Sequence, residues 1–182
     1  MFIGLPLSDT VRGDVFAFIQ NLMRYNMHGG VTWVAPEALH VTVQFLGQQD
    51  EAMRSTITNI LNTVVKEFEP FTLTLNRIEA FPSLKQQRVI AIRCHNDGRA
   101  LFHLRQQLVT ALKQENIAFE EGRNVWIPHI TLARNKIPGY FFRRLTELSL
   151  PKSRWSVERV VLYESQLTPT GPVYTEVYSA YI

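Results

Sequence analysis

The sequence predicts an α+β protein with two pseudo-symmetric lobes, largely antiparallel sheets that face a central cleft, and helices on the outside. Three observations lead to this fold class. Segments with helical spacing alternate with segments rich in β-branched residues, and each half of the chain has the order helix, strand, helix, strand, strand. No Gly/Ser-rich or Pro-rich linker separates the halves. We therefore expect a single domain over residues 1–182, with lobes at about 1–95 and 96–182.

The composition is that of a folded protein with an ordinary core. Of its 182 residues, 46% are hydrophobic and 19% are charged, which excludes a disordered chain. The formal net charge of +3 suits an anionic ligand but is too small for a protein that coats nucleic acid. A single cysteine, Cys94, excludes a disulfide framework and a Cys-rich zinc module.

The first element is a short apolar strand, Phe2 to Leu7, followed by Ser8 and Asp9 as the N-cap of a helix. Apolar residues at helical spacing then continue from Thr10 to Tyr25. The chain starts without a basic segment and its apolar stretch is short, so we expect no signal peptide. No run approaches about 18 apolar residues, so we expect no membrane span and a cytoplasmic protein.

The remaining elements follow from the same two periodicities, 3.6 for helices and 2 for strands. In the first half we expect a strand at Leu39–Leu46, a helix that begins at Asp50, and strands at Phe71–Ala80 and Arg88–Cys94. In the second half we expect a helix around Leu101–Leu112, a strand at Trp126–Ala133, a short helix at Tyr140–Leu148, and strands at Ser156–Tyr163 and Val173–Tyr181.

The equivalent middle strands of the two halves carry the same short motif. His40 and Thr42 lie in LHVTVQFLG, and His129 and Thr131 lie in PHITLAR, about half of the chain away. Side chains alternate along a strand, so each His projects from the same face as the Thr two residues later. If the two strands face each other, two imidazoles and two hydroxyls line one cleft.

This set of groups suits phosphodiester displacement. One neutral imidazole can accept a proton from the attacking oxygen while a charged imidazole donates one to the leaving oxygen. The hydroxyls of Thr42 and Thr131 can hold the non-bridging oxygens of the phosphate, and no metal is required. A single His on a strand is more often structural, but two copies in matching places favour a catalytic pair.

The sequence resembles the 2H phosphoesterases, in their bacterial branch of RNA 2′,3′-cyclic phosphodiesterases, also named 2′-5′ RNA ligases. The resemblance rests on LHVTVQFLG and PHITLAR and extends to TWVAPEALH and VVLYESQLTPTGPVYTEV. It implies a bilobal α+β fold with the motifs facing across a cleft. It also implies metal-free and cofactor-free hydrolysis of an RNA or nucleoside 2′,3′-cyclic phosphate to a 2′-phosphomonoester.

Carried over to this chain, the resemblance makes His40 and His129 the acid–base pair and places Thr42 and Thr131 on the phosphate. We assign His40 as the general acid and His129 as the general base. Arg134 is a candidate to contact phosphate or base, although strict alternation puts it on the face opposite His129, so a twist or bulge is needed. Phe45 could stack on a base, but alternation makes it a core residue first.

Other polar residues have simpler interpretations. His28, His95 and His103 have no partner motif, and their surroundings argue against a zinc site. Cys94 ends an apolar strand and is expected to be buried and inert. A basic stretch after the second motif either extends an RNA path or forms a solvated helix face over buried aromatic residues; it comprises Arg134, Lys136, Arg143 and Arg144.

Three functions remain open at this stage. The favoured function is a cyclic phosphodiesterase acting on RNA 3′ ends or nucleotides with a 2′,3′-cyclic phosphate, as a monomer away from membranes. The same site in reverse would join a cyclic phosphate end to a 5′-hydroxyl through a 2′-5′ bond. A nucleotide- or RNA-binding module without turnover is the third alternative, and two matched imidazoles argue against it.

Overall fold

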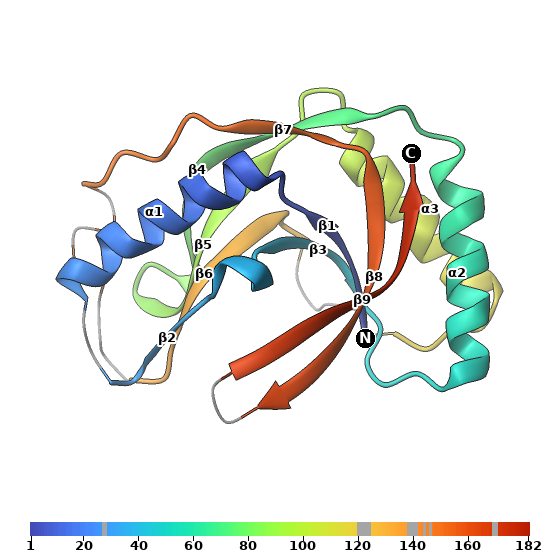
Figure 1. Cartoon of the computed structure of the whole chain (residues 1–182), viewed down its shortest axis with the longest axis horizontal. Coiled ribbons are helices and arrows are strands. Elements are labelled where there is room, and N and C mark those ends of the chain that lie inside the picture. The colour runs from blue at the N-terminus through green and yellow to red at the C-terminus, as the bar shows by residue number, and fades with distance from the viewer. Residues whose placement is uncertain (27–28, 120–124, 138–141, 144, 146, 169–170) are drawn as a thin grey trace.

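The computed structural model describes residues 1–26, 29–119, 125–137, 142–143, 145, 147–168 and 171–182. Figure 1 shows three helices around a strongly curved sheet. The elements in chain order are β1 (Phe2–Pro6), α1 (Asp9–Tyr25), β2 (Val31–Trp33), the 3₁₀ helix η1 (Pro36–Ala38), β3 (His40–Phe45), α2 (Glu51–Val65), β4 (Phe71–Ser83), β5 (Gln86–His95), α3 (Ala100–Gln114), β6 (His129–Asn135), β7 (Arg154–Val157), β8 (Arg159–Thr168) and β9 (Gly171–Tyr181).

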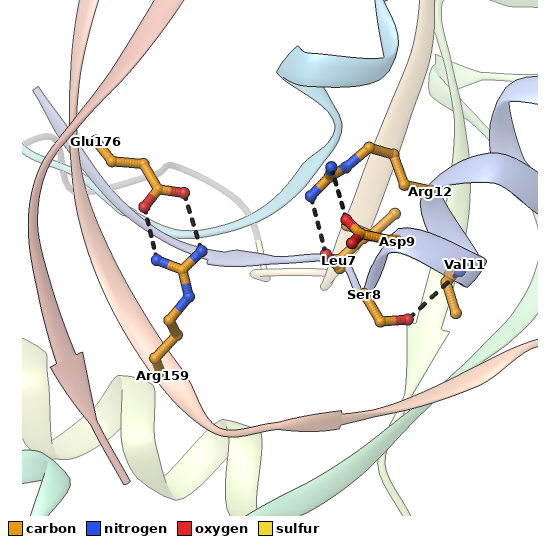
Figure 2. Close-up of polar contacts among 7 residues, drawn as sticks. All are labelled: Leu7, Ser8, Asp9, Val11, Arg12, Arg159 and Glu176. Carbon is orange, nitrogen blue, oxygen red and sulfur yellow. Dashed lines mark hydrogen bonds and ion pairs between the residues drawn. The ribbon is translucent and has the colours of Figure 1, made fainter.

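Two of the predicted helix starts carry side-chain caps. The Ser8 hydroxyl accepts a hydrogen bond from the backbone N–H of Val11 at 3.4 Å, and the Asp50 carboxylate accepts one from Met53 at 2.8 Å. Figure 2 shows the first of these caps together with Arg12, which donates to Asp9 and to the Leu7 carbonyl. These bonds confirm the predicted transition from the first strand into α1.

Some predicted elements differ from the observed ones. The short strand β2 was not predicted, because three residues are too few to show a period of two. The strand expected at Ser156–Tyr163 is divided at Glu158 between β7 and β8, which pair with different neighbours. The helix expected at Tyr140–Leu148 falls partly outside the described residues, and its described residues lie in turns or irregular backbone.

The strands form an antiparallel sheet in the order β7-β4-β5-β6-β3-β1-β8-β9, and β2 pairs with the free side of β6. Every strand pair is antiparallel, so the predicted α+β class is confirmed. β3 and β6 meet at one residue pair, Val41 opposite Ile130. The two motif strands therefore share the shortest pairing in the sheet.

The two halves of the chain exchange strands across that junction. The hairpin β4–β5 of the first half pairs with β6 of the second half, and the hairpin β8–β9 pairs through β1 with β3 of the first half. Lobes at 1–95 and 96–182 therefore do not correspond to blocks of the sheet. Periodicity predicts the elements of each half, but it does not tell which strands pair.

The helices bury their apolar faces against the outer side of the curved sheet. α2 and α3 pack together near β3, β8 and β9, and α1 contributes Val11, Val15 and Phe18 to the same continuous core. In Figure 1, α1 passes in front of β4 and β5, while α2 and α3 lie beyond β8 and β9. Within the part of the chain that the structure describes, no helix is long and apolar enough to span a membrane.

Removing the side chain of Ile130 tests how much the junction contributes to stability. Ile130 is fully buried and pairs with Val41, so Ile130→Ala leaves a cavity where the two motif strands meet. We expect the free energy of unfolding to fall by about 2–5 kcal/mol in urea titrations. Val125→Ala is the control, because Val125 is 87% exposed, and it should change that energy by less than about 0.5 kcal/mol. Equal effects of the two substitutions would contradict the role of this contact.

Candidate active site

The pairing of β3 with β6 brings the two sequence motifs together. Val41 lies opposite Ile130 in antiparallel register, so the residues on either side of this pair also face each other across the strands. His40 is next to Thr131, and Thr42 is next to His129. Val41 and Ile130 point into the core, and the four motif residues point to the other face of the sheet.

These four residues line one cavity of about 350 Å³ on the concave face of the sheet. Among the predicted site residues, the structure therefore brings together both histidines, both threonines, Arg134 and Phe45. The remaining wall comes from β2 and the segment after it, the hairpin β4–β5 and the start of β9: Thr32, Trp33, Val34, Ala35, Ala38, Phe81, Val89, Pro172 and Tyr174.

Each imidazole is held by the same backbone contact. Nδ1 of His40 lies 2.7 Å from the Ala38 carbonyl oxygen, and Nδ1 of His129 lies 2.7 Å from the Ile127 carbonyl oxygen. A carbonyl can only accept, so in both residues Nδ1 carries the proton and donates it. Nε2 is then the atom free for proton exchange. In His40, Nε2 also lies 3.0 Å from the Thr42 hydroxyl.

An aromatic ring packs against each imidazole and restricts its orientation. The Phe2 ring stacks on His40 with centroids 4.6 Å apart, and the Phe81 ring lies 4.9 Å from that of His129. Tyr174 contacts His40 edge-on at 5.1 Å. The chemistry of both imidazoles is therefore confined to the Nε2 edge.

Burial in this cavity lowers the pKa of both imidazoles. The pKa of His40 falls from 6.5 to about 4, mainly because burial penalises the charged form; the hydrogen bond to Ala38 opposes the shift. The pKa of His129 is also lowered by burial, and the Ile127 carbonyl opposes this. The Arg134 charge lowers both values, whereas Glu79 raises that of His129. With no ligand bound, both imidazoles are neutral at pH 7.

Two β-bulges turn Phe45 and Arg134 into the cavity. Gly4 of β1 pairs with Thr42 of β3, and the next residue of β1, Ile3, pairs with Gln44. β3 therefore contains one extra residue between these two pairs, which reverses the alternation of its side chains from there on. Phe45 is consequently 50% exposed and lines the cavity. The expectation that Phe45 is first of all a core residue was wrong, because strict alternation does not survive a bulge.

The second bulge lies at the equivalent place on β6. Ala91 of β5 pairs with Thr131 of β6, and the neighbouring Ile90 pairs with Ala133, so β6 contains one extra residue between these pairs. This register shift confirms the bulge that Arg134 needs in order to share a face with His129. Phe45 and Arg134 each stand five residues after their motif histidine, so they are equivalent residues of different chemistry on the two sides of the cavity.

Contacts beyond the paired strand residues hold both bulges, and no sequence pattern indicated them. The Val43 carbonyl accepts a hydrogen bond from Nε of Arg105 at 3.1 Å, and the Thr42 carbonyl accepts one from the Trp126 indole at 3.2 Å. On β6, the Leu132 carbonyl accepts from the backbone N–H of Val34 at 2.9 Å. Arg105 lies on α3 far from both motifs, and helical periodicity alone does not indicate such a contact.

The other candidate residues of the sequence lie away from this cavity. His95 pairs with Asp97 at 2.9 Å, and His103 is exposed on α3. Cys94 is buried as predicted, and burial raises the pKa of its thiol. Lys136 and Arg143 do not line the cavity.

His28 and Arg144 lie outside the described residues. Among the residues that are described, no group of three or more His, Cys, Asp or Glu is placed to hold a metal ion.

Comparison with known proteins relates this chain to a known family. Residues 14–168 match the 2′-5′ RNA ligase superfamily. An RNA 2′,3′-cyclic phosphodiesterase of Thermotoga maritima is 32% identical over 178 residues, which cover 97% of this chain and 92% of the relative. One of Bacillus subtilis is 24% identical and covers 97% of this chain and 93% of the relative.

Solved structures agree in fold over the whole chain. The crystal structure of TT0787 of Thermus thermophilus superposes with a TM-score of 0.83 at 26% identity, covering 99% of this chain and 96% of the other. Escherichia coli LigT in complex with 3′-AMP superposes with a TM-score of 0.75 at 19% identity, covering 100% of this chain and 96% of the other.

The lowered pKa of His40 makes stability depend on pH. The unfolded chain binds a proton on this imidazole near pH 6.5 and the folded protein only near pH 4, so acidification favours the unfolded chain. Stability present above pH 6.5 should therefore be lost progressively as the pH falls toward 4. We expect His40→Gln to lose less free energy of unfolding over this range than the wild type.

Urea titrations at several pH values measure this difference, and NMR titration of the imidazole measures the pKa directly. His103→Gln is the control, since His103 is exposed, and it should leave the pH dependence close to that of the wild type. A His40 imidazole that titrates near pH 6.5 in the folded protein would show that burial does not control its charge.

Proposed function

The chain belongs to the 2′-5′ RNA ligase superfamily, and from this premise we propose that it hydrolyses RNA or nucleoside 2′,3′-cyclic phosphates to 2′-phosphomonoesters. The observation that carries the proposal is the convergence of His40, Thr42, His129 and Thr131 on one cavity from two paired strands. The relatives of this chain from Thermotoga maritima and Bacillus subtilis bear the name of this activity.

In the proposed reaction, water attacks the phosphorus and the bond from phosphorus to O3′ breaks. His129 accepts a proton from the attacking water through Nε2, and His40 donates a proton to O3′ through Nε2. O2′ stays bonded to phosphorus, so the product carries a 2′-phosphate and a 3′-hydroxyl. The Thr42 and Thr131 hydroxyls donate to the non-bridging oxygens, on which negative charge concentrates in the transition state.

The buried imidazoles are neutral, and one of them becomes protonated only when the substrate binds. A cyclic phosphate carries one negative charge, and placing it between the two rings favours the protonated form of an imidazole and raises its pKa. The charged acid is thus formed when an anion enters the cavity. This coupling supports an anionic substrate and explains how groups with lowered pKa values act near pH 7.

The two bulge residues are proposed to bind the substrate on opposite sides of the reacting phosphate. The Arg134 side chain forms no hydrogen bond or ion pair with the described residues, so its guanidinium is free to contact a phosphate oxygen or a base edge. Phe45 presents a half-exposed ring on which a nucleobase can stack. All these residues belong to one chain, so we propose that a monomer is sufficient for activity. We also propose that the protein acts in the cytoplasm.

Ligation by the same site remains a second candidate. If a 5′-hydroxyl takes the place of water, the same acid and base can form a phosphodiester, by microscopic reversibility. A non-catalytic binding module is less well supported, since binding alone does not require two imidazoles with matching Nδ1 contacts.

Loss of either imidazole should abolish most of the activity. We expect His40→Ala and His129→Ala each to lower kcat about 10²–10⁴-fold on an oligonucleotide with a 2′,3′-cyclic phosphate, in buffer containing EDTA. The wild type should yield a 2′-phosphate, identified by ³¹P NMR, and His103→Ala should retain full activity. Activity that EDTA abolishes, or that survives either histidine substitution, would refute the metal-free two-histidine mechanism.

A substrate with sulfur in place of O3′ distinguishes the acid from the base. A thiolate leaves without protonation, so the variant that lacks the acid should recover most of its rate on this substrate. We expect recovery in His40→Ala and none in His129→Ala. Recovery in His129→Ala alone would reverse the assignment, and recovery in neither would mean that both imidazoles act before the leaving bond breaks.

A further inference from the structure

A second cavity adjoins the active cavity on the side of His129. It has a volume of about 740 Å³ and shares the lining residues Phe81 and Val89 with the active cavity, so the two are adjacent. We call it the β4–β5 groove, because most of its lining comes from that hairpin: Glu79, Ala80, Phe81, Pro82, Ser83, Leu84, Arg88 and Val89, with Val125 and Ile127.

Positive charge accumulates on the face of the sheet beside this groove, although Arg77 and Arg93 do not line the groove themselves. Arg93 lies directly opposite His129 across β5 and β6, and Arg77 lies directly opposite Arg93 across β4 and β5. Directly opposed residues point to the same face, so a row of cationic groups continues outward from the catalytic imidazole. Glu79 is shared between them, 3.2 Å from Nε of Arg77 and 3.8 Å from Nη1 of Arg93.

Arg88 adds a further charge at the outer part of the groove. It is the extra residue where the register of β4 and β5 shifts between Phe81 and Pro82. It is exposed and forms no hydrogen bond or ion pair with the described residues. With Arg77, Arg93 and the shared Glu79, this face carries a formal charge of about +2.

Apolar side chains lie beside these charges. Val125 is 87% exposed and Leu84 is 58% exposed, and both line the groove. Exposed apolar groups next to the unpaired guanidinium of Arg88 match single-stranded nucleic acid, which presents base faces and phosphates in alternation. A purely anionic small ligand would not use the apolar part.

The opposite rim of the active cavity lacks this positive charge. It is formed by Phe45, Pro172 and Tyr174, none of which is charged. In the neighbouring hairpin β8–β9 two glutamates are each matched by an arginine, so these pairs carry no net charge: Arg159 forms two bonds to Glu176, at 2.6 and 3.1 Å (Figure 2), and Arg54 of α2 pairs with Glu164. A polyanionic strand that leaves the cavity is therefore attracted toward the β4–β5 groove.

We propose that the β4–β5 groove binds the RNA strand on the 5′ side of the cyclic phosphate, which makes an oligonucleotide a better substrate than a mononucleotide. This inference rests on the proposed function. The active cavity is at the lower end of the range of small-molecule sites, about 300–1,000 Å³, so it holds the terminal nucleotide and the strand must lie outside it.

Hydrolysis rates on substrates of different length test the proposal. The substrates are a 2′,3′-cyclic mononucleotide and single-stranded oligonucleotides of two to six nucleotides with the same cyclic end. In the wild type, kcat/KM should rise with length at low salt and then level off. Arg88→Glu should lower kcat/KM about tenfold on the longer substrates and leave the mononucleotide unchanged. Arg88→Gln should reduce the slope of log(kcat/KM) against log[salt] by about 0.7, the value for one phosphate contact.

The matched control is Arg24→Glu, which changes the net charge equally on the exposed face of α1. It should behave like the wild type on every substrate. The groove proposal is overturned if Arg88→Glu and Arg24→Glu affect oligonucleotides equally, if Arg88→Glu slows the mononucleotide as much as the oligonucleotides, or if wild-type kcat/KM does not change with length. A wild type that hydrolyses neither class of substrate would instead refute the proposed function, so the two failures are distinguishable.

Discussion

The antiparallel contact between Val41 and Ile130 is the constraint on which the site depends. It joins β3 to β6 at one residue pair, and it places the two motifs in a local two-fold relation. Each histidine then lies beside the threonine of the other motif, and both pairs face the same cavity. The equivalent bulges, one residue beyond each threonine, extend this relation to Phe45 and Arg134. A pair of short motifs thus becomes a site with matched chemistry at its centre and different chemistry at its two sides.

Burial links the protonation state of the two imidazoles to the binding of an anion. Removing an imidazole from water disfavours its charged form, so the folded protein holds His40 and His129 neutral, and the backbone carbonyls of Ala38 and Ile127 fix which nitrogen carries the proton. An anion in the cavity opposes this penalty. Proton affinity and ligand binding are therefore coupled, and the same burial that lowers stability in acid prepares the site for a negatively charged substrate.

Strand exchange between the halves makes the two rims of the cavity unequal. The hairpin β4–β5 lies next to β6, while the hairpin β8–β9 lies beyond β1 on the side of β3. On the first hairpin, Arg77, Arg88 and Arg93 outnumber the single Glu79 that pairs with two of them, whereas Arg159 of the second hairpin is matched by Glu176. The net positive charge thus lies on one side of a nearly symmetric cavity, which is the side where we propose that the RNA strand binds.

By itself, the sequence determined the α+β class, the helix caps at Ser8 and Asp50, and the shared face of each His–Thr pair, because these follow from local periodicity and hydrogen bonding. It also indicated that Arg134 would need a bulge. Only the tertiary structure decided that Phe45 leaves the core, that Arg105 holds the β3 bulge, and that the halves exchange hairpins. A bulge and a strand neighbour are properties of two segments at once, and a pattern along one segment contains no information about its partner.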